Sequence, residues 1–350
     1  MPTALDHYRL LGHSGLRVSP LCLGTMTFGE EWGWGAGKDE SRQQLDLYAG
    51  LGGNFIDTAN FYTGGTSESL LGEFLEGRRD RFVLATKYTL GMGEKDPNAA
   101  GNHRKNLHQA LEASLKRLRT DYIDLYWVHM FDGLTPLEEM MRALDDAVRA
   151  GKLLYVGVSD FPAWMVARAN TLAEWRGWSP FVGLQIEYSL VERAPERDLI
   201  PMAQALGLGV TPWSPLGQGS LTGKFLDKSK QDPASRLAQA GESELNQKYV
   251  SPAADKAAAA VVEVAERIGR SPAQVALAWL LHQPGVVSPI IGGRKTPQIE
   301  DNLKAVEVSL SAEDLKTLDA ASAIPLGFPH DFLKYEFVKN AYTGGSTIQK

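Results

Sequence analysis

The chain contains 350 residues, of which 43% are hydrophobic and 22% are charged, as in an ordinary globular protein. Lys and Arg number 36 and Asp and Glu number 42, which gives a formal net charge of −6. A negative chain without long blocks of like charge argues against a nucleic acid as the main partner.

Cysteine content and hydropathy indicate the compartment. Cys22 is the one cysteine, so no internal disulfide can form, which fits a reducing environment. The first ten residues lack the apolar core of a signal peptide, and the apolar stretch Ala273–Leu281 is too short to span a bilayer. We therefore expect a cytoplasmic protein that does not bind membranes.

Short apolar or β-branched runs alternate with segments of helical pattern along most of the chain. This alternation is typical of a parallel sheet, and eight such units favour a closed barrel over an open sheet. We predict an α/β protein in which residues 1–350 form a single (β/α)₈ TIM barrel domain. The predicted strands are Pro20–Gly24, Asn54–Asp57, Phe82–Lys87, Ile123–His129, Leu153–Ser159, Val182–Glu187, Gly209–Trp213 and Val286–Gly292.

Helices are predicted between these strands. Asn102–Arg119 has leucines on one helical stripe and reads as amphipathic. Pro136, Pro195 and Pro272 are placed to begin helices, and Gly151 is placed to end one.

Three segments fall outside the eight units. Tyr8–Leu11 and Leu16–Val18 predict a small N-terminal hairpin that closes the bottom of the barrel. Lys224–Val250 is long, polar and weakly periodic, and such loops are usually functional or mobile. The segment from Pro325 onward, rich in aromatic residues, is expected to be a loop or tail lying against the barrel.

Polar residues follow nearly every predicted strand, and the active sites of such barrels lie at the carboxyl ends of their strands. Asp57, Tyr62, Lys87 and His129 follow or end three consecutive strands. A nearby ammonium lowers the high pKa of a tyrosine, and a carboxylate keeps that ammonium charged. A histidine beside the tyrosine can hydrogen-bond a substrate oxygen. The four residues therefore indicate proton transfer to the oxygen of a small-molecule substrate.

These four residues resemble the catalytic tetrad of the aldo-keto reductases, in the bacterial-type, aryl-alcohol-dehydrogenase-like branch, and the resemblance covers nearly the whole chain. It implies that NADPH transfers a hydride to the carbonyl carbon while Tyr62 donates a proton to the oxygen. Lys87 and Asp57 would tune Tyr62, and His129 would orient the carbonyl. The reverse reaction would oxidise an alcohol, and the resemblance implies no metal.

The resemblance also implies an NADPH/NADP+ site. Ser159, Asp160 and Gln185 would hold the nicotinamide carboxamide, and Trp213 would stack on the ring. Arg294, beside Lys295, would bind the 2′-phosphate that distinguishes NADP from NAD. The complete expected set is Gly24, Thr25, Met26, Asp57, Ser159, Asp160, Gln185, Trp213, Ser214, Pro215, Leu216, Gly217, Gln218, Gly219, Lys224, Gly292, Arg294, Gln298 and Asn302.

One residue departs from the family pattern. The family usually has Asn where Asp160 stands, and an ionised carboxylate can accept a hydrogen bond but cannot donate one. Cofactor affinity could therefore differ from the family norm.

The substrate is expected to contact Tyr62, His129 and the aromatic residues Phe28, Trp32 and Trp34, which would suit an apolar or aryl carbonyl.

Several alternatives stay open at this point. Asp57 and Lys87 could form an ordinary ion pair, and His129 or Trp213 could be a core residue. A cofactor-binding regulatory subunit, like the potassium-channel β subunits, also keeps tetrad-like residues. An alcohol or sugar dehydrogenase working in the oxidative direction is a third candidate. The sequence leaves the physiological substrate and the oligomeric state undetermined.

Overall fold

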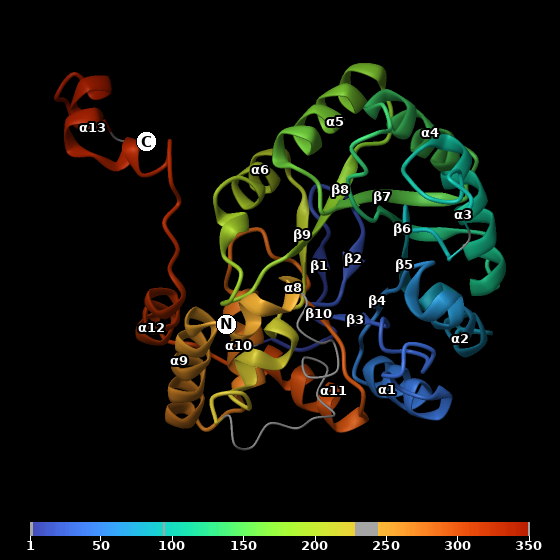
Figure 1. Cartoon of the computed structure of the whole chain (residues 1–350), viewed down its shortest axis with the longest axis horizontal. Helices are drawn as coiled ribbons and strands as arrows, with labels where there is room; N and C mark the ends of the chain where they lie inside the picture. The colour runs from blue at the N-terminus through green and yellow to red at the C-terminus, as the bar shows by residue number, and fades with distance from the viewer. Residues whose placement is uncertain (1–2, 94, 228–243, 349–350) are drawn as a thin grey trace.

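The structure is a computed structural model that describes residues 3–93, 95–227 and 244–348. Within them, eight parallel strands follow one another around a barrel surrounded by helices (Figure 1), which confirms the predicted (β/α)₈ fold. The strands are β3 (Cys22–Gly24), β4 (Phe55–Asp57), β5 (Val83–Tyr88), β6 (Ile123–Val128), β7 (Leu153–Ser159), β8 (Phe181–Glu187), β9 (Gly209–Trp213) and β10 (Ile290–Ile291).

The barrel closes between its last two strands. β10 pairs with β3. It spans Ile290–Ile291 and is therefore shorter than the strand predicted over Val286–Gly292. Val286 forms an isolated parallel bridge to Val210 in β9, and Val287 N donates to Val210 O at 2.8 Å. The residues before β10 thus complete the ring through these isolated contacts.

The predicted helices are present with small shifts at their ends. Helix α3 (Arg104–Leu118) covers most of the predicted Asn102–Arg119 segment, and Pro272 begins α10 (Pro272–Leu281) as expected. Pro136 is the N-cap of α4 (Leu137–Arg149), one position before the first turn, and Pro195 lies in the short 3₁₀ helix η3 (Ala194–Glu196). The helices packed around the barrel are α1 (Lys38–Gly50), α2 (Thr66–Phe74), α3 (Arg104–Leu118), α4 (Leu137–Arg149), α5 (Ala163–Arg176), α6 (Leu199–Leu206), α9 (Pro252–Ile268), α10 (Pro272–Leu281), α11 (Thr296–Leu303) and α12 (Ala312–Ser322). In the described part of the chain, none of the helices has the length and apolarity needed to cross a bilayer.

The N-terminal hairpin closes the bottom of the barrel, as predicted. It consists of β1 (Arg9–Leu10) and β2 (Arg17–Val18), paired antiparallel. Leu11, at its turn, is fully buried in the same apolar cluster as Trp127, inside the barrel. The backbone of Gly12 comes so close to β9 that an added Cβ would lie 2.7 Å from Gly209 N. The hairpin therefore packs directly on the N-terminal end of a barrel strand.

Two other segments differ from expectation or lie partly outside the described residues. In the loop predicted over Lys224–Val250, residues 228–243 lie outside the described part, and α8 (Glu244–Gln247) and η6 (Lys248–Val250) follow it. The prediction that the aromatic C-terminal segment lies against the barrel holds for its first residues, where Pro325 and His330 contact the protein body, but not for the rest. The segment carries a helix of its own, α13 (Glu336–Thr343), which has no buried residue and stands away from the barrel (Figure 1). Its aromatic side chains pack on one another, as described below.

The interior of the barrel depends on one large side chain and two glycines. Trp127 in β6 is fully buried, and its ring lies over the neighbouring strands β7 and β8. A Cβ added to Gly157 would lie 2.4 Å from the Trp127 ring, and one added to Gly183 would lie 2.8 Å from it. These two glycines leave the space that the indole fills.

The substitution Gly157→Ala should therefore destabilise the fold. The added methyl group must displace Trp127 in a packed interior, which costs about 1–3 kcal/mol of unfolding free energy. Gly50→Ala is the matched control, because nothing lies within 4 Å of its added Cβ at the exposed end of α1. It should be neutral or stabilising by up to about 1 kcal/mol. Denaturant midpoints compare the two, and equal midpoints would contradict this account of the core.

Candidate active site

The alternation of side chains along the strands points three of the four predicted catalytic residues into the barrel. Phe55, Ala85 and Trp127 belong to the interior apolar cluster, and successive side chains in a strand point to opposite faces. The residues two positions further along the chain therefore also face inward, at the C-terminal ends of their strands. These residues are Asp57, Lys87 and His129.

Tyr62 reaches the same point through the turn that follows β4. Its backbone N–H donates to Ala59 O at 3.2 Å, and Asn60 N donates to Lys87 O at 3.1 Å. The chain after β4 thus stays bonded to β5 before it enters η1 (Tyr62–Gly65). This turn carries the tyrosine hydroxyl over the end of β5.

Lys87 is the centre of the site. Its side chain is fully buried, and Nζ pairs with the Asp57 carboxylate. Nζ also donates to the backbone oxygen of Thr58 and to the Tyr62 hydroxyl, both at 2.9 Å. An ammonium has three N–H groups, so all of its donors are used. The three catalytic candidates Asp57, Lys87 and Tyr62 are therefore one hydrogen-bonded unit.

Burial and charge act in opposite directions on these groups. Burial alone would lower the pKa of Lys87, but Asp57 and Tyr62 outweigh it and raise that pKa to about 12. Burial raises the pKa of Tyr62 above its usual value, although Lys87 acts to lower it. Lys87 acts on the tyrosine in the predicted direction, but loss of hydration exceeds the effect of the ammonium, so the pKa of Tyr62 is raised. At neutral pH the lysine is charged and the tyrosine is protonated.

His129 lies beside the tyrosine and is neutral. The two rings are 6.0 Å apart between centroids and meet edge to face. Burial, with Lys87 adding to it, holds the pKa of His129 well below its usual value. Its Nδ1 is buried and has no hydrogen-bond partner among the described residues. A neutral imidazole in this position can donate a hydrogen bond to a bound oxygen without carrying charge.

The next two strand ends extend the polar rim. Gln185 Nε2 donates to the second oxygen of Asp57 at 2.9 Å, so this glutamine is tied to the ion pair. Ser159 is buried at the end of β7. Asp160 follows it with a φ of 51°, and its Oδ1 accepts a hydrogen bond from Trp213 Nε1 at 3.1 Å. Limited hydration raises the pKa of Asp160 to about 6.

The residues after β3 have mixed environments. The Thr25 hydroxyl is fully buried and donates to Asp57 O at 3.0 Å, so it supports the backbone of the site. Gly24 pairs with Asp57 across the strands, and Met26 is partly exposed. Phe28 was expected to contact the substrate, but it is fully buried in the hydrophobic core and offers no surface to one.

Three other aromatic rings line up beside Tyr62. Trp32 meets the Tyr62 ring edge to face at 6.4 Å between centroids. Trp34 and Phe61 each lie 5.6 Å from Trp32. Trp32 and Trp34 are partly exposed. We call Trp32, Trp34 and Phe61 the aromatic wall.

The loop after β9 has features that suit a phosphate. Ser214 has a φ of 49°, and Pro215 and Leu216 lead into η4 (Gly217–Thr222), where Gly217, Gln218 and Gly219 all have positive φ. The buried atoms Gln218 Oε1 and Ser220 Oγ have no hydrogen-bond partner among the described residues. Lys224 Nζ would lie 2.8 Å from a Cβ added to Gly219. A buried hydroxyl without a partner and a nearby ammonium fit an anionic ligand.

The expected adenosine end lies at the start of α11. Gln298 Oε1 accepts from the backbone N–H groups of Arg294, at 2.8 Å, and Lys295, at 3.2 Å. Glu40 of α1 accepts from the Thr296 hydroxyl at 2.7 Å and from its backbone N–H. Gln298 therefore shapes the turn that carries the two cations. Gly292 is exposed, whereas Asn302 is buried.

The structure adds two rim residues that the sequence did not indicate. Glu187 ends β8, and its carboxylate lies 2.6 Å from Lys248 Nζ. The Tyr249 hydroxyl also donates a hydrogen bond to Glu187. These contacts fix η6 to the barrel mouth. The partners lie about sixty residues apart in the sequence, and no local pattern marks them.

Comparisons with known proteins identify the family. The chain is 40% identical over 343 residues to norsolorinic acid reductase of Aspergillus flavus, covering 95% of this chain and 85% of that protein. It is 38% identical over 341 residues to an aryl-alcohol dehydrogenase of Pestalotiopsis microspora, covering 95% and 86%. It is also 38% identical over 347 residues to aryl-alcohol dehydrogenase (NADP(+)) of Phanerodontia chrysosporium, covering 94% and 89%.

The family assignment rests on a match over most of the chain. The sequence model described as the aldo/keto reductase family matches residues 20–323, from just before β3 to the end of α12. This confirms the resemblance found in the sequence, and two of the relatives above carry the aryl-alcohol dehydrogenase name. The chain belongs to the aldo/keto reductase family, whose members are oxidoreductases that use nicotinamide cofactors.

Proposed function

We propose that this protein is an NADP(H)-dependent oxidoreductase that reduces aldehydes or ketones to alcohols, with Tyr62 as the proton donor. The observation that carries the proposal is the buried Lys87 ammonium, which bridges the Asp57 carboxylate and the Tyr62 hydroxyl at the barrel mouth. A structural ion pair between Asp57 and Lys87 does not require a partly exposed phenol as a third member. Proton transfer to a substrate does require such a group.

The residues of this unit have separate tasks. Bound NADPH supplies the hydride. Tyr62 is protonated at neutral pH and holds its proton at the hydroxyl oxygen until a carbonyl oxygen accepts it. Lys87 then stabilises the phenolate that remains, since its charge lies 2.9 Å from that oxygen. Asp57 keeps Lys87 charged and in place.

His129 positions the substrate oxygen. It is neutral, so its ring can donate a hydrogen bond without adding a second positive charge beside Lys87. Preorganised donors of this kind stabilise the developing charge on a reacting oxygen. The buried Nδ1 of His129 has no hydrogen-bond partner among the described residues. This supports a binding site in which a ligand completes the hydrogen bonds.

The cofactor assignment rests on both ends of the rim. Gln218, Ser220 and Lys224 would hold the pyrophosphate, and Arg294 with Lys295 would bind a 2′-phosphate. Ser159, Gln185 and Asp160 would meet the carboxamide, beside the Trp213 ring. One relative is named for NADP(+), in agreement with a cation pair at the adenosine end.

The aromatic wall favours an aryl carbonyl as substrate. Trp32 stands beside the Tyr62 ring, so a flat substrate whose oxygen meets the Tyr62 hydroxyl would contact the indole. Aromatic contacts contribute about 0.5–1.5 kcal/mol beyond area burial, which would separate aryl from alkyl substrates. The relatives named for aryl alcohols support the same class.

The substitution Tyr62→Phe should abolish carbonyl reduction while leaving NADPH binding intact. Loss of a positioned proton donor lowers the rate by about 10²- to 10⁴-fold. NADPH oxidation by wild type and variant on a panel of aryl, aliphatic and sugar aldehydes measures this, and NADPH fluorescence measures binding. A wild-type protein that binds NADPH but reduces nothing on the panel would contradict the proposal and favour a regulatory cofactor-binding role.

The substitution Asp160→Asn should remove a pH dependence of cofactor preference. As pH rises through about 6, Asp160 becomes negative and attracts the positive nicotinamide ring of NADP+ but not the neutral ring of NADPH. In wild type, the affinity for NADP+ relative to NADPH should therefore rise several-fold between pH 5 and pH 7.5. Both forms carry the same phosphates, so the ratio of dissociation constants isolates the ring. A ratio in Asp160→Asn that still changes with pH would contradict this role.

The substitution Trp32→Ala should lower kcat/KM for aryl aldehydes about five- to tenfold and leave short aliphatic aldehydes nearly unchanged. Trp175→Ala is the matched control, because that tryptophan is exposed on α5 and contacts neither Tyr62 nor the aromatic wall. Steady-state kinetics with benzaldehyde and butanal make the comparison. Equal losses on both substrates in Trp32→Ala would show that the wall does not select aryl groups.

A further inference from the structure

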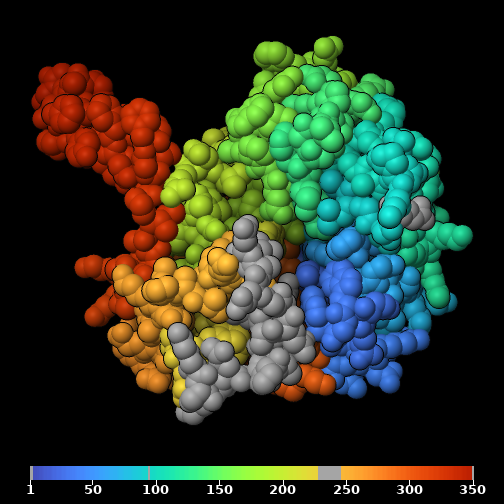
Figure 2. Space-filling view, in the orientation of Figure 1, coloured from blue at the N-terminus to red at the C-terminus, as the bar shows by residue number. Residues whose placement is uncertain are grey.

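The C-terminal arm, residues 324–348, exposes an unusual amount of apolar surface. Neither η8 (Phe332–Lys334) nor α13 contains a buried residue. Figure 2 shows α13 projecting beyond the barrel, with open space between it and the rest of the molecule. The large hydrophobic side chains exposed on the arm are Phe328, Phe332, Leu333, Tyr335, Phe337, Tyr342 and Ile348.

The aromatic rings of the arm pack on one another and not on the barrel. Phe332 lies at the centre, with ring centroids 5.9 Å from Phe328, 6.3 Å from Tyr335 and 6.1 Å from Phe337. Tyr335 and Phe337 stack at 5.9 Å. The arm therefore presents a preformed aromatic face, which can bind a partner with a small loss of side-chain entropy.

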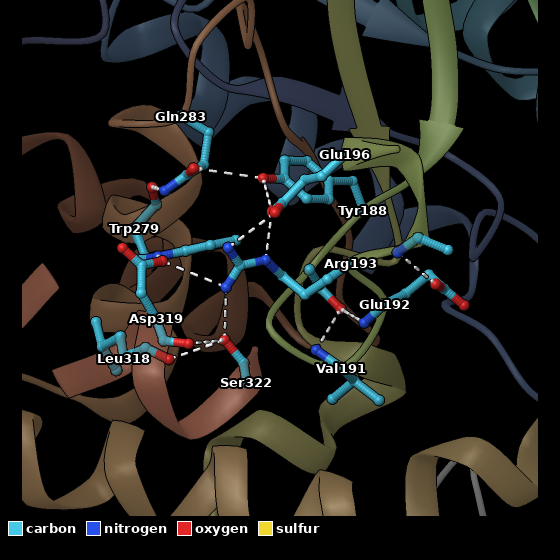
Figure 3. Close-up of polar contacts among 12 residues, drawn as sticks. Tyr188, Val191, Glu192, Arg193, Glu196, Trp279, Gln283, Leu318, Asp319 and Ser322 are labelled. Carbon is cyan, nitrogen blue, oxygen red and sulfur yellow. Dashed lines mark hydrogen bonds and ion pairs between the residues drawn. The ribbon is translucent and has the colours of Figure 1, made fainter. Parts of the chain in front are cut away.

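A buried network fixes the root of the arm. Arg193 pairs with Glu196 and donates to Asp319, at 3.3 Å, and to Ser322, at 2.7 Å, at the end of α12 (Figure 3). Trp279 Nε1 also donates to Asp319, at 3.0 Å. The direction in which the chain leaves α12 is therefore set by the protein body.

Two further contacts guide the first residues of the arm past α6. Arg197 Nη2 donates to Pro325 O at 3.0 Å, and His330 lies 3.6 Å from the Asp198 carboxylate. Both partners belong to the segment between η3 and α6. The arm thus begins against this segment, and its aromatic face continues beyond it.

The apolar area of the arm matches that of a protein interface. At ~200 Å² for each fully exposed large side chain, the seven hydrophobics present roughly 800 Å². A stable interface buries ~800 Å² on each partner. The arm alone therefore carries enough apolar surface for one side of a dimer contact.

A groove of ≈ 690 Å³ lies next to the root of the arm, between α5 and α6. Its apolar lining includes Trp164, which is 64% exposed, together with Leu199 and Met202. Arg197 and Asp198 line the groove and also contact the arm. The arm and the groove are therefore neighbours on one face of the molecule.

We propose that the arm of one copy docks into the α5–α6 groove of a second copy, and that the second arm docks into the first groove. A two-fold contact requires both complementary surfaces on the same face of each protomer, and this face has both. The arm does not fill its own groove, because α13 stands clear of α5 and α6 (Figures 1 and 2). The family match ends at residue 323, so this contact would be an addition to the common barrel.

The test measures the mass of the full chain in solution by sedimentation. Wild type should sediment at twice the chain mass of 38.2 kDa at micromolar concentration. The double variant Phe332→Glu/Phe337→Glu and the groove variant Trp164→Glu should each weaken the dimer at least about thirtyfold, as expected for the loss of a central aromatic anchor. Trp175→Glu is the matched control, because Trp175 is 80% exposed on the same helix but outside the groove, and it should remain dimeric.

Mixing the arm variant with the groove variant separates exchange between copies from docking within one chain. Each variant alone loses both arm–groove contacts of its dimer, whereas a mixed dimer keeps one intact arm in one intact groove. The mixture should therefore form more dimer than either variant alone. A monomeric wild type, a dimer insensitive to either variant, or a mixture with no gain in dimer would each overturn the proposal. Circular dichroism checks that these surface variants fold.

Discussion

The buried Lys87 ammonium is the interaction on which the rest of the site depends. An ammonium taken out of water costs several kcal/mol unless its charge and its three donors are matched. Asp57 supplies the charge, and Thr58 O and the Tyr62 hydroxyl complete the donors. Two strands and the following turn must therefore keep fixed positions, and the inward alternation of β4 and β5 provides them. The same constraint places the tyrosine hydroxyl at the mouth of the barrel.

The electrostatics of the rim follow from this one charge and from limited hydration. Lys87 opposes the effect of burial on Tyr62 and adds to the effect of burial on His129. The result is two neutral donors beside a permanent cation, an arrangement that suits a neutral carbonyl which gains negative charge as it reacts. Asp160 differs from these groups, because burial raises the pKa of its carboxylate to about 6 although the hydrogen bond from the Trp213 indole acts to lower it. It brings a variable charge to a rim that is otherwise constant.

The segments outside the eight β/α units have different relations to the barrel. The hairpin of β1 and β2 is joined to it closely, with Leu11 buried inside and the backbone of Gly12 against β9. The C-terminal arm is joined near its root, through Arg193, Arg197 and Asp198, and keeps its apolar face outside. Leu11 closes the barrel end through burial within the chain, whereas the exposed aromatic face of the arm is available to a partner.

The sequence by itself determined the barrel, most strand positions and the four residues at its mouth. The carboxyl ends of the strands of a barrel meet at one rim, so Asp57, Lys87 and His129 could be placed there from the predicted strands without coordinates. Only the tertiary structure decided what depends on distant neighbours. Phe28 is buried, Tyr62 has a raised pKa because burial exceeds the effect of Lys87, and Lys248 and Tyr249 bind Glu187 across about sixty residues. The position of the arm also belongs here, since apolar sequence predicts burial but does not say whether its own chain or another provides it.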